Sequence, residues 1–342
     1  MPAEPHVVAV VNARHLRRAG FTGTLFLSSG GREPPEALTV ARDEHDDCVF
    51  FEREAGRLCV IHRDAGIEAL PLACRHFPRK VLHDSRGTLI SLSHFCPTAA
   101  RMLLAPGSLA IVAARPPLRL SPPVEGLDAS GALPPLLRPG LLCDPAGYQA
   151  WEHAGIATFA RDDLTSRECV ELIAGATEAV RLWEPGRESL VERVRTAFEN
   201  AGPVKDSDLN AHERAMRTVA ALSEGRTAGY SPIDRFEECW DRHVAAHFAA
   251  YEGPMRNYLA ARLFANWIAY QGRGLRSVVE WLRVCAAVLR HALLARVLGS
   301  ASPPGPEDFV EAVRAADLLL LHVIDSAAFA TYVGALEGPE PR

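Results

Sequence analysis

Residues 275–299 read LRSVVEWLRVCAAVLRHALLARVLG, and their part from Val284 to Leu298 is among the most apolar stretches of the chain. Its apolar residues recur every three or four positions, which is the period of an α-helix that packs into a core. Arg290, His291 and Arg296 interrupt the run, so it stays short of the roughly 18 uninterrupted apolar residues that a membrane-spanning helix needs. The stretch therefore predicts a long helix in the core of a helical body.

The helical pattern extends from Asp144 to about residue 335. Asp144 followed by Pro145 is typical of a helix start. Thr165 and Glu168 have the spacing of a capping box, which opens a helix running to about Trp183. Clusters of Gly and Pro separate the later segments. We expect further helices at 187–201, 207–223, 232–251, 254–271 and 306–335.

The apolar faces of these helices predict the residues of the core. Cys143, Cys169 and Cys285 lie in apolar or helical surroundings without partner spacing, so we expect them to pack as small core residues. His322 stands among leucines and valines and is expected to be a hydrogen-bonded core histidine rather than a catalytic base. The helical body is expected to bury Leu259, Leu263, Trp267, Trp281, Leu282, Leu289, Leu293 and Leu320.

The first 115 residues follow another pattern, with short apolar runs separated by Gly, Pro and Asp. After them, residues 115–140 hold seven prolines and three glycines, a composition typical of a linker or an extended strap. We therefore expect a cysteine-rich domain at 1–115, a strap at 116–143 and a helical domain at 144–336. The fold class is mainly α, with a small irregular N-terminal part packed on a multi-helix body. Its short strands are expected at Thr22–Leu27, Cys48–Phe51, Leu58–Ile61 and Leu89–Leu92.

The charge balance restricts the classes of partner. The chain has 37 basic and 42 acidic residues among 342, a formal net charge of -5. Without a basic excess, nucleic acid and anionic membrane surfaces are not expected partners.

The chain shows no secretory signal pattern, so we expect a cytoplasmic protein. Thiols stay reduced in that compartment, and a local concentration of cysteines there indicates metal or redox chemistry before disulfides.

Cys48, Cys59, Cys74 and Cys96 form such a concentration within 49 residues. Four thiolates suffice for a tetrahedral zinc ion or a cubane iron–sulfur cluster. The spacing is C-x10-C-x14-C-x21-C, without a C-x2-C pair, so generic zinc-ribbon and ferredoxin patterns do not apply. The alternative is that these cysteines are buried hydrophobic residues. If they are ligands, their sulfurs converge. The same stretch also contains His45, His62, His76, His83 and His94.

The residues around these cysteines carry a family resemblance. The segments DCVFF (47–51), GRLCVIH (56–62), LPLACRHFPR (70–79) and SLSHFCP (91–97) together resemble the flagellin lysine-N-methylase family and its zinc- or iron-chelating cysteine-cluster relatives. Arg256–Leu259, RNYL, is a weaker similarity. The resemblance implies that Cys48, Cys59, Cys74 and Cys96 are the metal ligands, with Arg75, Pro78 and Arg79 in the turn after the third cysteine.

One family feature is missing. Relatives carry a further cysteine group near the N-terminus, whereas residues 21–31 here read FTGTLFLSSGG. The resemblance implies methyl transfer from S-adenosylmethionine to a lysine of a flagellin-like protein substrate. It also implies an iron–sulfur cluster or zinc, and a cleft lined by aromatic and carboxylate groups between the cysteine part and the helices. No catalytic or S-adenosylmethionine-binding residue is assigned.

Two other function classes remain open. The first is a non-catalytic helical protein that binds a partner and carries a structural or degenerate metal site, which the missing cysteines favour. The second is a metal carrier or redox sensor, which the lack of a resolving C-x2-C pair disfavours. Cys239, His243 and His247 share one face of a predicted helix, but HVAAH lacks the glutamate of a zincin motif. We expect them on an ordinary helix surface or subunit contact.

Overall fold

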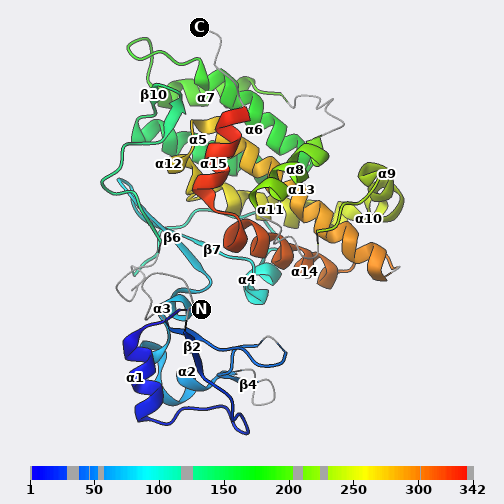
Figure 1. Ribbon diagram of the computed structural model, residues 1–342. Helices are drawn as coiled ribbons and strands as arrows, with labels where there is room; N and C mark the ends of the chain where they lie inside the picture. The colour runs from blue at the N-terminus through cyan, green and yellow to red at the C-terminus, as the bar shows by residue number, and fades with distance from the viewer. Residues whose placement is uncertain are drawn as a thin grey trace. The chain divides into compact units, whose positions relative to one another are not determined.

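The computed structural model describes residues 2–28, 38–45, 47–52, 58–116, 126–202, 211–223, 230–300 and 302–336 (Figure 1). The predicted fold class is confirmed, because the protein is mainly helical with small sheets in its N-terminal part. The described residues fall into two compact units, divided between Phe77 and Pro78. Unit 1 holds the residues before this point and unit 2 those after it. The sequence placed this boundary at about residue 115, which is 38 residues further on.

Unit 1 is built on helix α1, whose buried Val7 and Val11 pack with Val49, Phe50 and Ile61 in one small apolar core. Two antiparallel sheets accompany it, with strand orders β1-β3-β2 and β4-β5. The elements are β1 (Pro2–Ala3), α1 (Pro5–Ala13), β2 (Phe26–Ser28), β3 (Leu38–Val40), β4 (Phe51–Glu52), β5 (Leu58–Cys59), α2 (Val60–Ala65), the 3₁₀ turn Ile67–Ala69 and α3 (Leu72–His76).

The strands of unit 1 are shorter than predicted. Cys48 makes only an isolated bridge to Arg42, so the expected strand Cys48–Phe51 is reduced to β4, which begins at Phe51. The expected strand Leu58–Ile61 ends at Cys59, because α2 begins at Val60. These four-residue apolar runs suit a buried helix turn as well as a strand, and tertiary packing decides between them.

Unit 2 begins with a sheet in the order β7-β6-β8. Strands β6 and β7 form an antiparallel hairpin, which the sequence predicted only for β7, and β8 pairs parallel with β6. Residues 126–143 were expected to be a strap, yet they form β8, β9 and β10, and they bury Leu137 and Cys143. The strands are β6 (Arg79–Asp84), β7 (Gly87–Leu92), β8 (Leu127–Asp128), β9 (Leu136–Arg138) and β10 (Leu141–Leu142).

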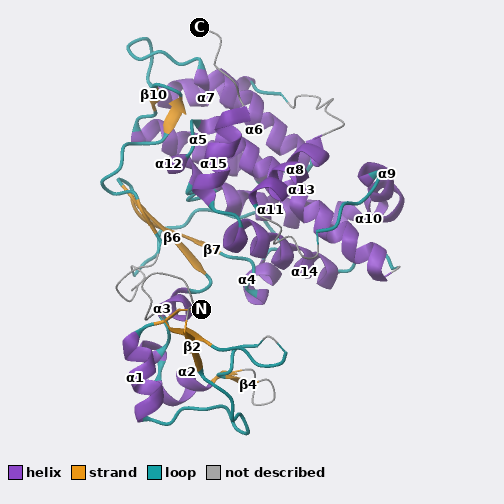
Figure 2. Cartoon of the chain, viewed as in Figure 1, coloured by secondary structure: helices purple, strands orange, loops and turns teal. Residues whose placement is uncertain are grey.

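The rest of unit 2 is helical (Figure 2). Capping explains several helix starts: Asp144 accepts from the Gly147 amide at 2.7 Å, and the predicted Thr165–Glu168 capping box is present. The helices are α4 (Pro97–Met102), α5 (Pro145–Phe159), α6 (Ser166–Arg181), α7 (Leu190–Asn200), α8 (Ala211–Leu222), α9 (Phe236–Trp240), α10 (Ala246–Phe248), α11 (Glu252–Leu263), α12 (Ile268–Gln271), α13 (Leu275–Ser300), α14 (Pro306–Asp317) and α15 (Ser326–Leu336).

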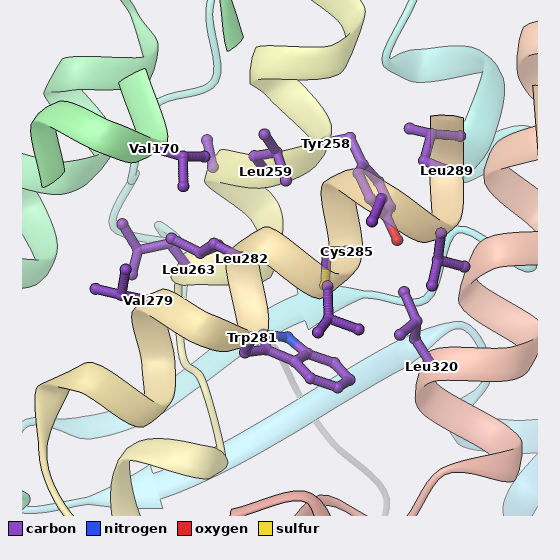
Figure 3. Close-up of a cluster of buried hydrophobic side chains, with 14 of the residues drawn as sticks. Val170, Tyr258, Leu259, Leu263, Val279, Trp281, Leu282, Cys285, Leu289 and Leu320 are labelled. Carbon is purple, nitrogen blue, oxygen red and sulfur yellow. The ribbon is translucent and has the colours of Figure 1, made fainter. Parts of the chain in front are cut away.

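Helix α13 contains the apolar stretch 275–299, and it packs against α6, α8, α11 and α14. Side chains from these elements meet around it, as Figure 3 shows for Tyr258, Leu259, Trp281 and Cys285. Seven of the eight predicted core residues are buried, whereas Trp267 is only partly buried. Cys143, Cys169 and Cys285 are buried as expected.

Two expected long helices are broken. The helix predicted at 254–271 splits into α11 and α12, because Ala265 adopts a left-handed φ of 51° and its amide donates to the buried Glu152 carboxylate at 3.0 Å. The Asn266 amide group donates to the Arg262 carbonyl, and its oxygen accepts from the Ile268 amide. These bonds satisfy backbone groups that a continuous helix would pair.

The helix predicted at 306–335 also splits, but at a π-helical turn. A π-helical turn, Leu318–Val323, follows α14, and Asp325 then accepts from the Ala328 amide at 2.8 Å and opens α15. The helix predicted at 232–251 starts only at Phe236 and passes through a second π-helical turn, Asp241–Ala245, and a 3₁₀ turn, Ala249–Tyr251.

Within the described ranges, no single helix has the length and apolar character to cross a membrane. The bent pair Pro306–Val323 and Ser326–Ala335, which meet at 85°, passes the same test together by length and composition.

Candidate functional sites

Three of the four predicted metal ligands lie in unit 1. Cys48 follows the turn after Arg42, Cys59 ends β5 opposite Phe51, and Cys74 lies in α3. All three are partly buried and pack against the same small apolar core. Residues separated by up to 26 positions are thus brought to one cluster, which we call the unit 1 thiol cluster.

Cys48 and Cys74 have raised pKa values, and the neighbouring Cys59 contributes to both shifts. Burial raises the pKa of Cys74 to about 12, and the charges of Cys48, Cys59 and Glu4 act in the same direction. Burial also raises the pKa of Cys48, with a further contribution from Cys59. Cys48 and Cys74 are therefore thiols rather than thiolates near neutral pH.

Soft thiol donors are the ligand type that zinc and iron–sulfur clusters prefer. In the part of the chain that the structure describes, however, no group of three or more His, Cys, Asp or Glu side chains is placed to hold a metal ion. Cys96, the fourth predicted ligand, belongs to unit 2, where it precedes α4 as its N-cap residue. The donor chemistry of the unit 1 thiol cluster fits a metal, while its described geometry is not a closed site.

The other predicted donors are dispersed. His45 and His62 are exposed, and His83 bonds with Thr88 through Nδ1 at 2.9 Å. The predicted face of Cys239, His243 and His247 is altered by the π-helical turn Asp241–Ala245, and both histidines are exposed. They stand on a helix surface, as the sequence predicted.

His322 is not a core residue, which corrects the prediction. It is exposed, although its Nε2 bonds with the Ser93 hydroxyl at 3.0 Å. The π-helical turn places it outward while its neighbours Leu319 and Leu320 are buried.

A buried ionic network in unit 2 escaped the sequence analysis. The Asp317 carboxylate, wholly buried, accepts from the Tyr258 hydroxyl at 3.0 Å and from the His94 amide, and lies 3.4 Å from the Arg262 guanidinium. Burial opposes ionisation of Asp317, but the Arg262 charge and the His94 bonds outweigh it and lower its pKa to about 2. Helix α11 is held to the end of α14 by this network.

The similarity at Arg256–Leu259 thus falls on residues with structural contacts. Asn257 bonds through its amide group to the backbone of Leu109 and Gly107, each at 3.0 Å. Tyr258 binds Asp317, and Leu259 is wholly buried in the core. Asp317 stands at the end of an apolar helix, and a carboxylate buried there requires a partner. This position in the sequence could have revealed the network.

A pocket of about 840 Å³ lies within unit 2, among helices α6, α8, α9, α11 and α13. Its wall includes the aromatic residues Trp240 and Phe248 and the carboxylates of Asp241 and Glu252. Arg290 lies over the Trp240 ring, 4.3 Å from its centroid. The size falls in the range of small-molecule and cofactor sites. The family resemblance implied a cleft lined by aromatic and carboxylate groups between the cysteine part and the helices. This pocket has aromatic and carboxylate residues in its wall, but it lies within unit 2 alone.

Comparison of the chain with protein-family models, with curated proteins and with solved structures yields no match.

Proposed function

We propose that this chain is a cysteine-cluster metalloprotein in which Cys48, Cys59 and Cys74 of unit 1 hold zinc or an iron–sulfur cluster. The observation that supports it is the gathering of three thiols on one core, close enough for their charges to affect one another. The resemblance of the surrounding segments to cysteine-cluster proteins points to the same residues.

The chemistry of the thiols supports metal uptake in which the three thiols move together around the ion. Cys48 and Cys74 are protonated near neutral pH, so binding a cation releases their protons, and the charge of the metal stabilises the thiolates that form. The described conformation does not hold the donors as a closed group. Uptake therefore requires the thiols to draw together, and the free energy of binding then stabilises unit 1.

The test is metal analysis of the full-length protein purified without oxygen. We expect either one zinc ion per chain or iron with acid-labile sulfide and visible absorption. Cys74→Ser should lose the metal, while Cys239→Ser, which changes a partly buried thiol of unit 2, should keep it. A chain that takes up neither zinc nor iron and sulfide under reconstitution contradicts the proposal and leaves the thiols as packing residues.

The pocket in unit 2 favours a second candidate, which is methyl transfer from S-adenosylmethionine to a protein lysine. Aromatic walls suit the adenine ring, and carboxylates suit ribose hydroxyls and the cofactor's ammonium group. The pocket offers both, and its 840 Å³ exceeds the size of a nucleoside. A methyl acceptor lysine must be neutral, which a desolvated slot promotes.

Calorimetric titration with S-adenosylmethionine tests this candidate. Phe248→Ala should weaken binding by about tenfold, which corresponds to about 1.4 kcal/mol, because it removes an aromatic wall of the pocket. Phe198→Ala, an equal truncation of a partly buried ring on α7, is the control and should bind as the parent does. Absence of binding at millimolar cofactor reassigns the protein to the alternative of a helical partner-binding protein.

A further inference from the structure

Lys80 is one of only two lysines in the chain, the other being Lys205. It lies on β6, where strand alternation places it on the same face as the buried Leu82 and Asp84. That face packs against the segment joining α11 and α12, since Leu82 shares a cluster with Ala265 and Trp267. The Lys80 amine lies 4.5 Å from the centroid of the Trp267 ring.

Lys80 lines a cavity of about 130 Å³ in unit 2. Arg262, Trp267, Trp281 and Asp325 are among the other wall residues, and the exposed Asp325 marks its solvent side. A cavity of about 150 Å³ in another protein accepts benzene, so this one suits a ligand of about six heavy atoms. The broken helix at residues 264–267 brings Trp267 to this position.

The charge environment of Lys80 is unusual for a lysine. Its side chain makes no hydrogen bond and no ion pair within 4.0 Å to any residue in the described ranges. Burial lowers its pKa to about 7, and the nearby Arg262 guanidinium acts in the same direction. Asp317 and Cys285 act in the opposite direction, but Asp317 is already paired with Arg262. The Lys80 amine is therefore neutral far more often at pH 7 than an ordinary lysine amine.

We propose that Lys80 is a nucleophilic amine that forms an imine with a small aldehyde or ketone bound in this cavity. Three features together support it: an amine without a polar partner, a cavity into which it opens, and an aromatic ring beneath it. The proposal is independent of both the thiol cluster and the 840 Å³ pocket.

The reaction balances without an oxidant or a reductant. The lone pair of the neutral amine attacks the carbonyl carbon, and the electron pair of the C=O bond moves to oxygen. Both amine protons leave with that oxygen as water, and a C=N bond replaces the C=O bond. Protonation of the imine restores a positive charge over the Trp267 ring, where a cation–π interaction stabilises it.

The test is reductive trapping with propanal and cyanoborohydride at pH 7, with the modified lysine located by peptide mass spectrometry. We expect Lys80 to be labelled about a hundredfold faster than Lys205, because the neutral fraction of an ordinary lysine is far smaller at this pH. Lys80→Arg should abolish the fast labelling, and Lys205→Arg should leave it unchanged. Pyridoxal, which is too large for the cavity, should show no preference for Lys80.

A second measurement needs no variant. Reductive ¹³C-methylation of the full chain introduces signals at the two lysines and the N-terminal amine, whose NMR shifts report their titration. The Lys80 signal should titrate near pH 7, well below the value of about 10.4 of an ordinary lysine. Equal labelling rates at the two lysines, or titration of both above pH 9, would overturn the proposal.

Discussion

Asp317 is a buried carboxylate that joins α11 to the end of α14. Asp317→Asn keeps the shape but leaves the buried Arg262 without its counter-charge. Breaking a buried pair from one side costs about 3–5 kcal/mol, so we expect a loss of that size in urea unfolding at pH 7. Glu307→Gln, in an exposed pair with Arg101, is the control and should change the free energy by less than about 1 kcal/mol.

The same residue predicts an acid limit. The folded pKa of Asp317, about 2, lies below its value in the unfolded chain. A lowered carboxyl pKa contributes stability that is present above about pH 4 and is lost as the pH falls toward 2. The stability difference between the parent and Asp317→Asn should therefore shrink over that range. A difference that is constant from pH 7 to pH 2 would contradict the ionised state.

Lys80 predicts a second pH dependence, at higher pH. Its folded pKa of about 7 lies below the ordinary value of 10.5, so the unfolded chain holds the proton more tightly, and burial of the amine destabilises the fold below pH 7. Lys80→Met removes this penalty and should stabilise the protein at pH 6 by roughly 2–4 kcal/mol. The gain should fall toward zero as the pH rises from 7 to 10.5, measured by thermal unfolding. A destabilised variant at pH 6 would show that the amine gains more from the Trp267 ring than it loses by desolvation.

Among the elements, α6 has the most complete start. Thr165 Oγ1 accepts from the Glu168 amide at 3.2 Å, and the Glu168 carboxylate accepts from the Thr165 amide at 2.8 Å. Thr165→Ala removes one half of this capping box and should cost about 1 kcal/mol of unfolding free energy. Thr331→Ala, at an exposed interior position of α15, should be neutral within about 0.5 kcal/mol. Equal effects in the two variants would show that the cap contributes nothing to stability.

At the scale of the whole molecule, the distribution of tryptophan separates the two units. All five tryptophans, at positions 151, 183, 240, 267 and 281, lie in unit 2. Their fluorescence therefore reports the unfolding of unit 2, while amide hydrogen exchange of residues 2–77 reports unit 1. If unit 1 holds the metal, a chelator or Cys74→Ser should raise exchange in unit 1 and leave the midpoint of the tryptophan transition unchanged. Loss of both signals together would mean that the metal stabilises more than unit 1.

The amino-acid pattern by itself determined the helical class, the starts of α5 and α6, and the burial of α13 and of Cys143, Cys169 and Cys285. These features depend on local hydrogen bonds and on the period of apolar residues, and a short segment of sequence is enough to determine both.

Tertiary structure alone decided the breaks at Ala265 and Asp325, the division at Phe77, and the partners of Lys80 and Asp317. For Ala265 and Asp317 the deciding groups are distant in sequence: the buried Glu152 accepts the Ala265 amide across 113 residues, and Asp317 accepts the His94 amide across 223. The gathering of Cys48, Cys59 and Cys74 belongs here too, since their spacing shows which thiols are available but not which core brings them together. A pKa and a helix break both depend on the groups that surround a residue in space. Segments distant in the sequence supply these groups, so no local sequence pattern reveals the desolvation that they cause.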